Sequence, residues 1–99
     1  MSFTFKVVTH LSGKLEDEGN IDIEIQVSNG DVYALTFFSV DDLLTQFRKN
    51  KVTGECRNGT YFWATDMIIV ETLSEEVIQQ TIQSLIEEDE LKDIGSKLN

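Results

Sequence analysis

The chain has 99 residues, with 18 Asp and Glu against 8 Lys and Arg, a formal net charge of −10, one His, one Cys and no Pro. An acidic surface repels phosphate backbones and anionic headgroups, so we expect no binding to nucleic acid or to membranes. The length fits one domain over residues 1–99, and 40% hydrophobic residues provide enough apolar surface for a core.

The sequence lacks the usual signals for secretion, membrane insertion and disulfide formation. The lone Cys56 has no internal disulfide partner, and no apolar run approaches the roughly 18 residues of a spanning helix. The first residues lack the basic segment and following apolar segment of a secretory signal. We therefore expect a cytoplasmic protein.

Two regions in the first third of the chain alternate apolar and polar residues, which predicts strands with one face against a core. The first is 3–7. The second, 21–28, is the clearest in the chain, and Asp22 and Glu24 lie on its solvent side. Its inward residues are Ile21, Ile23, Ile25 and Val27.

Asn29-Gly30 follows this strand directly and predicts a two-residue hairpin turn of type I′. The next strand, 31–38, should therefore pair antiparallel with the previous one. Apolar residues occur on both of its faces, which places it near the centre of the sheet.

A helical period begins after Ser39, which we expect to be the N-cap, with Asp42 three residues later in a capping box. The apolar stripe of this helix comprises Val40, Leu43, Leu44 and Phe47. The following residues, 50–60, contain Asn58-Gly59 and indicate either a loop or a small hairpin.

Residues 60–73 read either as one long bent strand or as two short strands. Tyr61, Phe62 and Trp63 are consecutive, so on a strand they cannot all face one side of the sheet. Whether they pack in the core or form an interface stays open at this point. Asp66 interrupts the apolar stretch and either occupies a turn or is partly buried.

The last main helix begins after Ser74 as its N-cap and ends at the acidic run 87–90. Its apolar stripe comprises Ile78, Ile82, Leu85 and Ile86. Leu91, Ile94 and Leu98 then indicate a short C-terminal helix, which Gly95 weakens. The whole order predicts an α+β two-layer sandwich: an antiparallel sheet of four or five strands with two main helices on one face.

Few residues are suited to catalysis. Cys56 neighbours Arg57, a cation that favours the thiolate, but the only imidazole, His10, is far away in the sequence. No Gly-x-Ser-x-Gly motif is present. We therefore predict no catalytic residues, and a small enzyme using Asp66, His10 or Cys56 ranks behind the other functional classes.

Acidic residues crowd between Glu16 and Glu24. In an EF-hand loop with Gly19 at the fixed glycine position, Lys14 and Ile25 would take the first and last ligand positions, and neither coordinates calcium. The glycines match neither a P-loop nor a dinucleotide-binding motif. We predict no metal ion and no cofactor.

Charge is distributed unevenly along the chain. Residues 15–47 and 71–93 each contain eight acids and together only one cation, Lys92. Four cations gather between these regions, namely Arg48, Lys49, Lys51 and Arg57. The acids serve either solubility alone or a basic partner, whose encounter complementary charge would accelerate.

We interpret the chain as a module that binds another protein, a basic one, in the manner of an inhibitor or immunity-like protein. The surface residues expected to contact this partner are Asp22, Glu24, Tyr61, Trp63 and Asp66. The alternative is a structural or assembly subunit that homo-oligomerises through its sheet, for instance as a homodimer.

Overall fold

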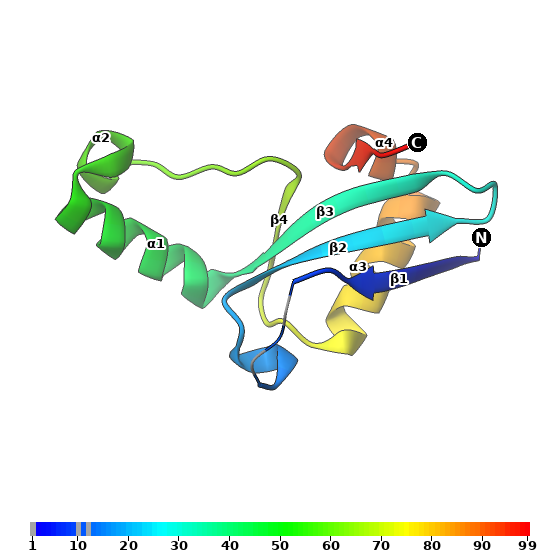
Figure 1. Cartoon of the computed structure of the whole chain (residues 1–99), viewed down its shortest axis with the longest axis horizontal. Coiled ribbons are helices and arrows are strands. Elements are labelled where there is room, and N and C mark those ends of the chain that lie inside the picture. The colour runs from blue at the N-terminus through cyan, green and yellow to red at the C-terminus, as the bar shows by residue number, and fades with distance from the viewer. Residues whose placement is uncertain (1, 10, 12) are drawn as a thin grey trace.

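A five-stranded sheet forms the centre of the fold (Figure 1). The structure, a computed structural model, describes residues 2–9, 11 and 13–99. The strands are β1 (Phe3–Val7), β2 (Asn20–Val27), β3 (Val32–Ser39), β4 (Met67–Val70) and β5 (Ser96–Lys97). The helices are the 3-10 helix η1 (Leu15–Asp17) and the α-helices α1 (Val40–Thr53), α2 (Glu55–Gly59), α3 (Glu75–Glu87) and α4 (Leu91–Ile94). The predicted α+β class is confirmed.

The central strand is β3, as predicted. It pairs antiparallel with β2, which in turn pairs antiparallel with β1. The other edge of β3 takes two short strands, β4 in parallel and β5 antiparallel. The parallel pair is possible because α1, α2 and the segment after them carry the chain back to the start of a new strand. The strand β5 was not predicted, because Leu91, Ile94 and Leu98 indicated a helix through these residues; the helix ends at Ile94.

The hairpin between β2 and β3 has a three-residue loop, so the predicted two-residue type I′ turn is wrong. The Gly30 N–H donates to the Val27 carbonyl at 2.9 Å, and the Val27 N–H donates to the Asp31 carbonyl at 3.0 Å. Only Gly30 in the loop has a positive φ, at 96°. A three-residue hairpin loop typically has a residue of positive φ at its last position, here Gly30. Such a loop still joins two antiparallel strands.

The hydrophobic core lies between the sheet and α3. The alternation of β2 is confirmed, because its four inward aliphatic residues are all buried. The Ser74 hydroxyl accepts a hydrogen bond from the Val77 N–H at 3.1 Å and starts α3 as predicted. The helix contributes Ile78, Ile82 and Leu85 to the core, and the short helix α4 adds Leu91.

The first main helix, α1, differs from α3 in its position. Its predicted N-cap is confirmed, since the Ser39 hydroxyl accepts from the Asp42 N–H at 3.1 Å. However, α1 projects beyond the end of the sheet (Figure 1) instead of lying on its face. Val40 and Leu44 are 44% and 49% exposed. Within the described residues, no α1 side chain belongs to the main hydrophobic core.

We call α1 and α2 together the arm. The expectation of a loop or hairpin over 50–60 is wrong, because α1 continues to Thr53 and α2 follows at once. Gly54 ends α1 with a φ of 84°, and Cys56, Arg57 and Asn58 all have left-handed backbone angles. Gly59 then packs against α1.

None of the helices in the described part of the chain is long and apolar enough to cross a membrane.

Candidate protein-binding surface

The sheet face opposite α3 carries no helix (Figure 1), and we call it the open face. Asp22 and Glu24 point to this face because they alternate with the buried residues of β2. The Thr36 hydroxyl donates to the Asp22 carboxylate at 2.8 Å, and the Thr9 hydroxyl accepts from the Asp22 N–H at 2.7 Å. Asp22 is exposed, so the prediction that it lies on the solvent side is confirmed.

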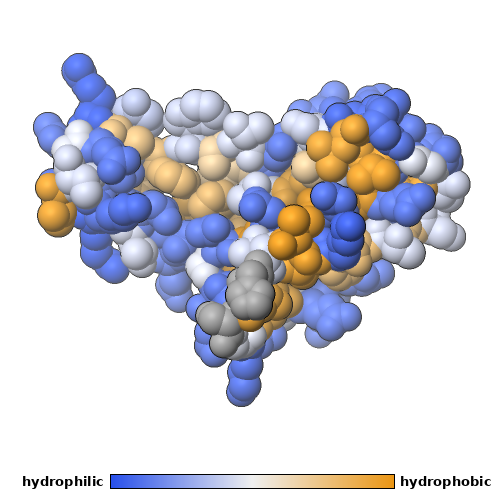
Figure 2. Space-filling view, viewed as in Figure 1, coloured by the Kyte–Doolittle hydropathy of each residue, from blue (hydrophilic) through white to orange (hydrophobic). Residues whose placement is uncertain are grey.

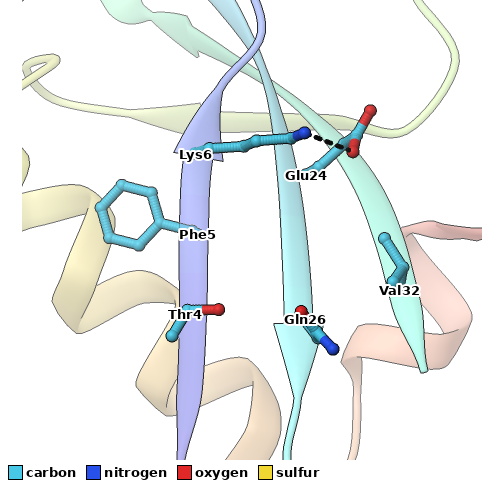
Figure 3. A pocket seen from close by; sticks show the side chains of 6 residues that line it. All are labelled: Thr4, Phe5, Lys6, Glu24, Gln26 and Val32. Carbon is cyan, nitrogen blue, oxygen red and sulfur yellow. Dashed lines mark ion pairs between the residues drawn. The ribbon is translucent and has the colours of Figure 1, made fainter. Parts of the chain in front are cut away.

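A shallow hollow of about 290 Å³ lies on the open face across β1, β2 and the start of β3 (Figure 3). The Lys6 ammonium lies 3.6 Å from the Glu24 carboxylate above it. The Lys6 side chain is 73% exposed and that of Glu24 is 35% exposed, so water screens this ion pair and it adds little stability. The remaining lining residues are Thr4, Phe5, Gln26 and Val32. Phe5 points away from the hollow towards the helix side.

Asp66 occupies a turn before β4 and is also partly buried, so both predicted alternatives hold together. Its φ is 59°, a left-handed value that Asp tolerates better than most residues. The Ser96 hydroxyl donates to its carboxylate at 2.6 Å, and the Thr36 N–H donates to its carbonyl at 2.9 Å. Ser96 pairs with Ala34, whose side chain faces opposite to the buried Leu35. Asp66 therefore lies on the same side of the sheet as Asp22 and Glu24.

The aromatic run does not form a strand. Residues 61–64 have no regular structure, so the prediction of a strand here is wrong, although side chains still alternate between inside and outside. The Phe62 ring packs edge-on against Phe38 with centroids 5.5 Å apart. Tyr61 and Trp63 are 49% and 68% exposed. Tyr61 and Trp63 thus lie on the surface, while Phe62 covers the end of β3.

A second concave region, the acidic groove, has a volume of about 550 Å³ and lies where η1, the start of α1 and the segment before α3 meet. Its carboxylates are those of Glu16, Asp17, Glu18, Asp41, Asp42 and Glu71, and no Lys or Arg of the described residues lines it. Within the described residues no group of three or more acids has the geometry to hold a metal ion. The six carboxylates give the groove a negative electrostatic potential.

The wall of the acidic groove depends on close packing at Gly19. A Cβ atom at Gly19 would lie 2.2 Å from Asp42 Oδ1, so a larger residue here would require the Asp42 side chain to move. The Asn20 amide donates to the Asp42 carboxylate at 3.1 Å and fixes it there. This carboxylate is therefore turned to Asn20, and the reciprocal half of the predicted capping box with Ser39 is not formed.

Sequence reasoning missed the groove because its acids come from three separate segments. The available signal was the unequal charge along the chain. Acids cluster before residue 43 and after residue 70, and the cations between them belong to the arm, where Lys51 donates to the Gly59 carbonyl at 3.1 Å.

Figure 2 shows pale and orange apolar surface over the arm and the segment that returns from it to β4, surrounded by hydrophilic surface.

The candidate catalytic residues are distributed over different parts of the fold. Cys56 is a partly buried free thiol in α2, and Asp66 lies at the sheet. His10 lies outside the described residues, so the absence of a Cys56–His10 pair stays a prediction.

At the junction of α3 and α4, the hydrogen bond from Lys92 to Asp89, 2.9 Å long, raises the pKa of Lys92 above its ordinary 10.5. Lys92 is thus held as a cation and is not an activated amine.

The arrangement thus offers an open sheet face with three acids, two exposed aromatic side chains and a separate acidic groove. Comparison of the chain with protein-family models, curated proteins and solved structures gave no match.

Proposed function

We propose that this domain binds a basic protein partner, and that it acts in the cytoplasm as an inhibitor or immunity-like protein without catalysing a reaction. The observation that supports this proposal best is the acidic groove, a concave surface whose described lining has six carboxylates and no Lys or Arg. A net charge of −10 adds a long-range field of the same sign. Lys or Arg side chains of a partner would therefore be attracted at a distance and bound in the groove.

The open face extends the same proposal. Asp22, Glu24 and Asp66 lie on this side of the sheet, and the exposed Tyr61 and Trp63 precede Asp66 in the chain. Tyr and Trp often anchor protein interfaces because they bury a large area at low cost in side-chain entropy. We expect the acids of both regions to set the association rate and the aromatic residues to slow dissociation.

The first test is capture of a partner from extracts of the source cells at about 50 mM salt, where charge attraction is screened least. We expect a protein with a basic surface to be retained and to be released at about 500 mM salt. Mass spectrometry identifies it, and the affinity of the purified pair is then measured by calorimetry. Retention of no basic protein at low salt would contradict the proposal.

A variant with half of the groove carboxylates removed tests whether the groove is the binding site. Glu16→Gln, Asp17→Asn and Glu71→Gln together remove three exposed groove carboxylates, and we expect the affinity to fall at least about tenfold. The matched control removes three exposed acids elsewhere, by Glu88→Gln, Glu90→Gln and Asp93→Asn. It has the same net charge, so an equal loss in both variants would refute the groove as the binding site.

The alternative proposal is assembly through the sheet. Its support is the outer edge of β1, which pairs on its inner side with β2 and has no strand on the other side within the described residues. Two features oppose strand addition at this edge: β1 has only five residues, and the fourth of them is Lys6. Short strands and lysine are common devices by which proteins protect sheet edges.

A further inference from the structure

One face of α1 combines exposed apolar side chains with charges that have no ion-pair partner in the described residues. Val40 and Leu44 are 44% and 49% exposed, although they belong to the apolar stripe of the helix. Asp41 and Arg48 lie beside Leu44, since residues at positions i, i+3 and i+7 share one face of a helix. Neither charge belongs to any of the ion pairs of the described residues.

We propose that this face of α1 binds the same face of a second copy of the chain, with the two helices antiparallel and related by a twofold axis. The axis passes between Leu44 and Thr45. In that arrangement Leu44 meets its counterpart at the centre, and Asp41 of each copy lies opposite Arg48 of the other. A twofold contact of this kind uses one surface patch twice and closes without further growth.

Charge complementarity selects a second copy as the occupant. Asp41 and Arg48 are separated by seven residues, about 10 Å along the axis, which is too far for them to pair within one helix. Reversing the direction of a second helix brings each acid to a cation, and two ion pairs form per dimer. A parallel arrangement would place Asp41 against Asp41 and Arg48 against Arg48, and like charges repel.

The contact is small. The 14 residues of α1 span about 21 Å, and a single helix pair buries less than the roughly 800 Å² per partner of a standard interface. The net charge of −10 on each copy also opposes association. We therefore expect a reversible dimer that forms at high micromolar concentration.

The test is sedimentation equilibrium of the full chain over about 10 to 500 µM, the range in which a small interface of this kind associates. Leu44→Glu should weaken dimerisation at least about tenfold, because it places two carboxylates at the twofold axis. The matched control is Val8→Glu, since Val8 is 52% exposed beside the sheet and should leave the dimer unchanged. A dimer that Val8→Glu weakens and Leu44→Glu does not would instead support assembly through the sheet, and it would overturn the proposal.

A charge exchange tests the direction of the helices. Asp41→Arg and Arg48→Asp should each weaken the dimer by about fivefold or more, whereas the double variant should return to within about twofold of the natural chain. Asp41→Arg lowers the overall repulsion between copies, so a weaker dimer in this variant cannot come from net charge. The double variant places a cation in the first turn of α1, where it opposes the helix dipole, so recovery cannot come from a more stable helix.

Two further outcomes would overturn the proposal. One is a chain that stays monomeric at every concentration tested. This outcome counts against the proposal even if α1 is found to bind a different protein. The other is a dimer whose affinity does not depend on Leu44, Asp41 and Arg48. Circular dichroism of each variant should match the natural chain, because all three side chains are exposed and their substitution removes no core contact.

Discussion

Gly59 and Gly30 both have a positive φ, but Gly59 is tightly packed and Gly30 is not. Gly59 has a φ of 77°, and a Cβ atom there would lie 2.7 Å from the Phe47 carbonyl oxygen and 2.9 Å from the Lys51 nitrogen. Gly30 has a φ of 96° and no atom within 4 Å of the same position. The first glycine is therefore required by both conformation and packing, and the second by conformation alone.

Substitution of these glycines separates the two effects. We expect Gly30→Ala to cost about 1 kcal/mol, the usual penalty for a left-handed residue with a side chain. Gly59→Ala should cost more, because α2 must move away from α1, and the loss should concentrate in the arm. Chemical denaturation gives the total, and hydrogen exchange at Gly54 and Thr60 gives the local part. Equal effects of both substitutions would show that Gly59 is not tightly packed.

The two main helices differ in how much of the fold depends on them. Ile82 of α3 is fully buried against the sheet, whereas Leu44 of α1 is half exposed. Ile82→Ala should therefore lower the free energy of unfolding by about 2–5 kcal/mol, the range for a large aliphatic residue in a core. Leu44→Ala should change it by no more than about 0.5 kcal/mol. Urea unfolding at low protein concentration measures both, and similar losses would place α1 in the core.

Local signals along the chain are strong enough to predict most elements. Ser39 and Ser74 both cap helices, because a serine before a helical apolar period offers its hydroxyl to the first turn. The strict alternation of β2 left one register that buries its aliphatic side chains. Even the turn at Asp66 follows from a polar residue inside an apolar stretch.

The features that could not be predicted from the sequence depend on contacts between distant segments. The period of α1 identifies its apolar stripe but not which part of it is covered: Leu43 and Phe47 are partly buried, whereas Val40 and Leu44 stay exposed. β5 has only two residues and no apolar alternation, and it is held by pairing with β3 and by the Asn99 amide, which accepts from the Val32 N–H at 2.9 Å. The acidic groove likewise exists only once three segments meet.

At the scale of the whole molecule, the net charge of −10 should lower stability through mutual repulsion of carboxylates. Raising sodium chloride from about 20 to 300 mM shortens the range of this repulsion to about 6 Å. We expect the melting temperature to rise by roughly 4–8 °C if about 1 kcal/mol is recovered. The variant with three neutral groove residues should show a smaller rise. A melting temperature that falls with salt would mean that attractive pairs dominate.

The position of β3 has a consequence for how the chain acquires its shape. The backbone of β3 pairs on one side with β2, its neighbour in the chain. On the other side it pairs with β4 and β5, which follow the arm and α4 in the sequence. Until these strands pair, the peptide groups beside Phe37 and Phe38 present an apolar, unprotected margin to any extended strand nearby. Long-range closure of this sort is slow compared with hairpin formation. We therefore expect aggregation to start from chains in which β4 has not yet paired, because β4 is the strand that covers the edge beside Phe37 and Phe38.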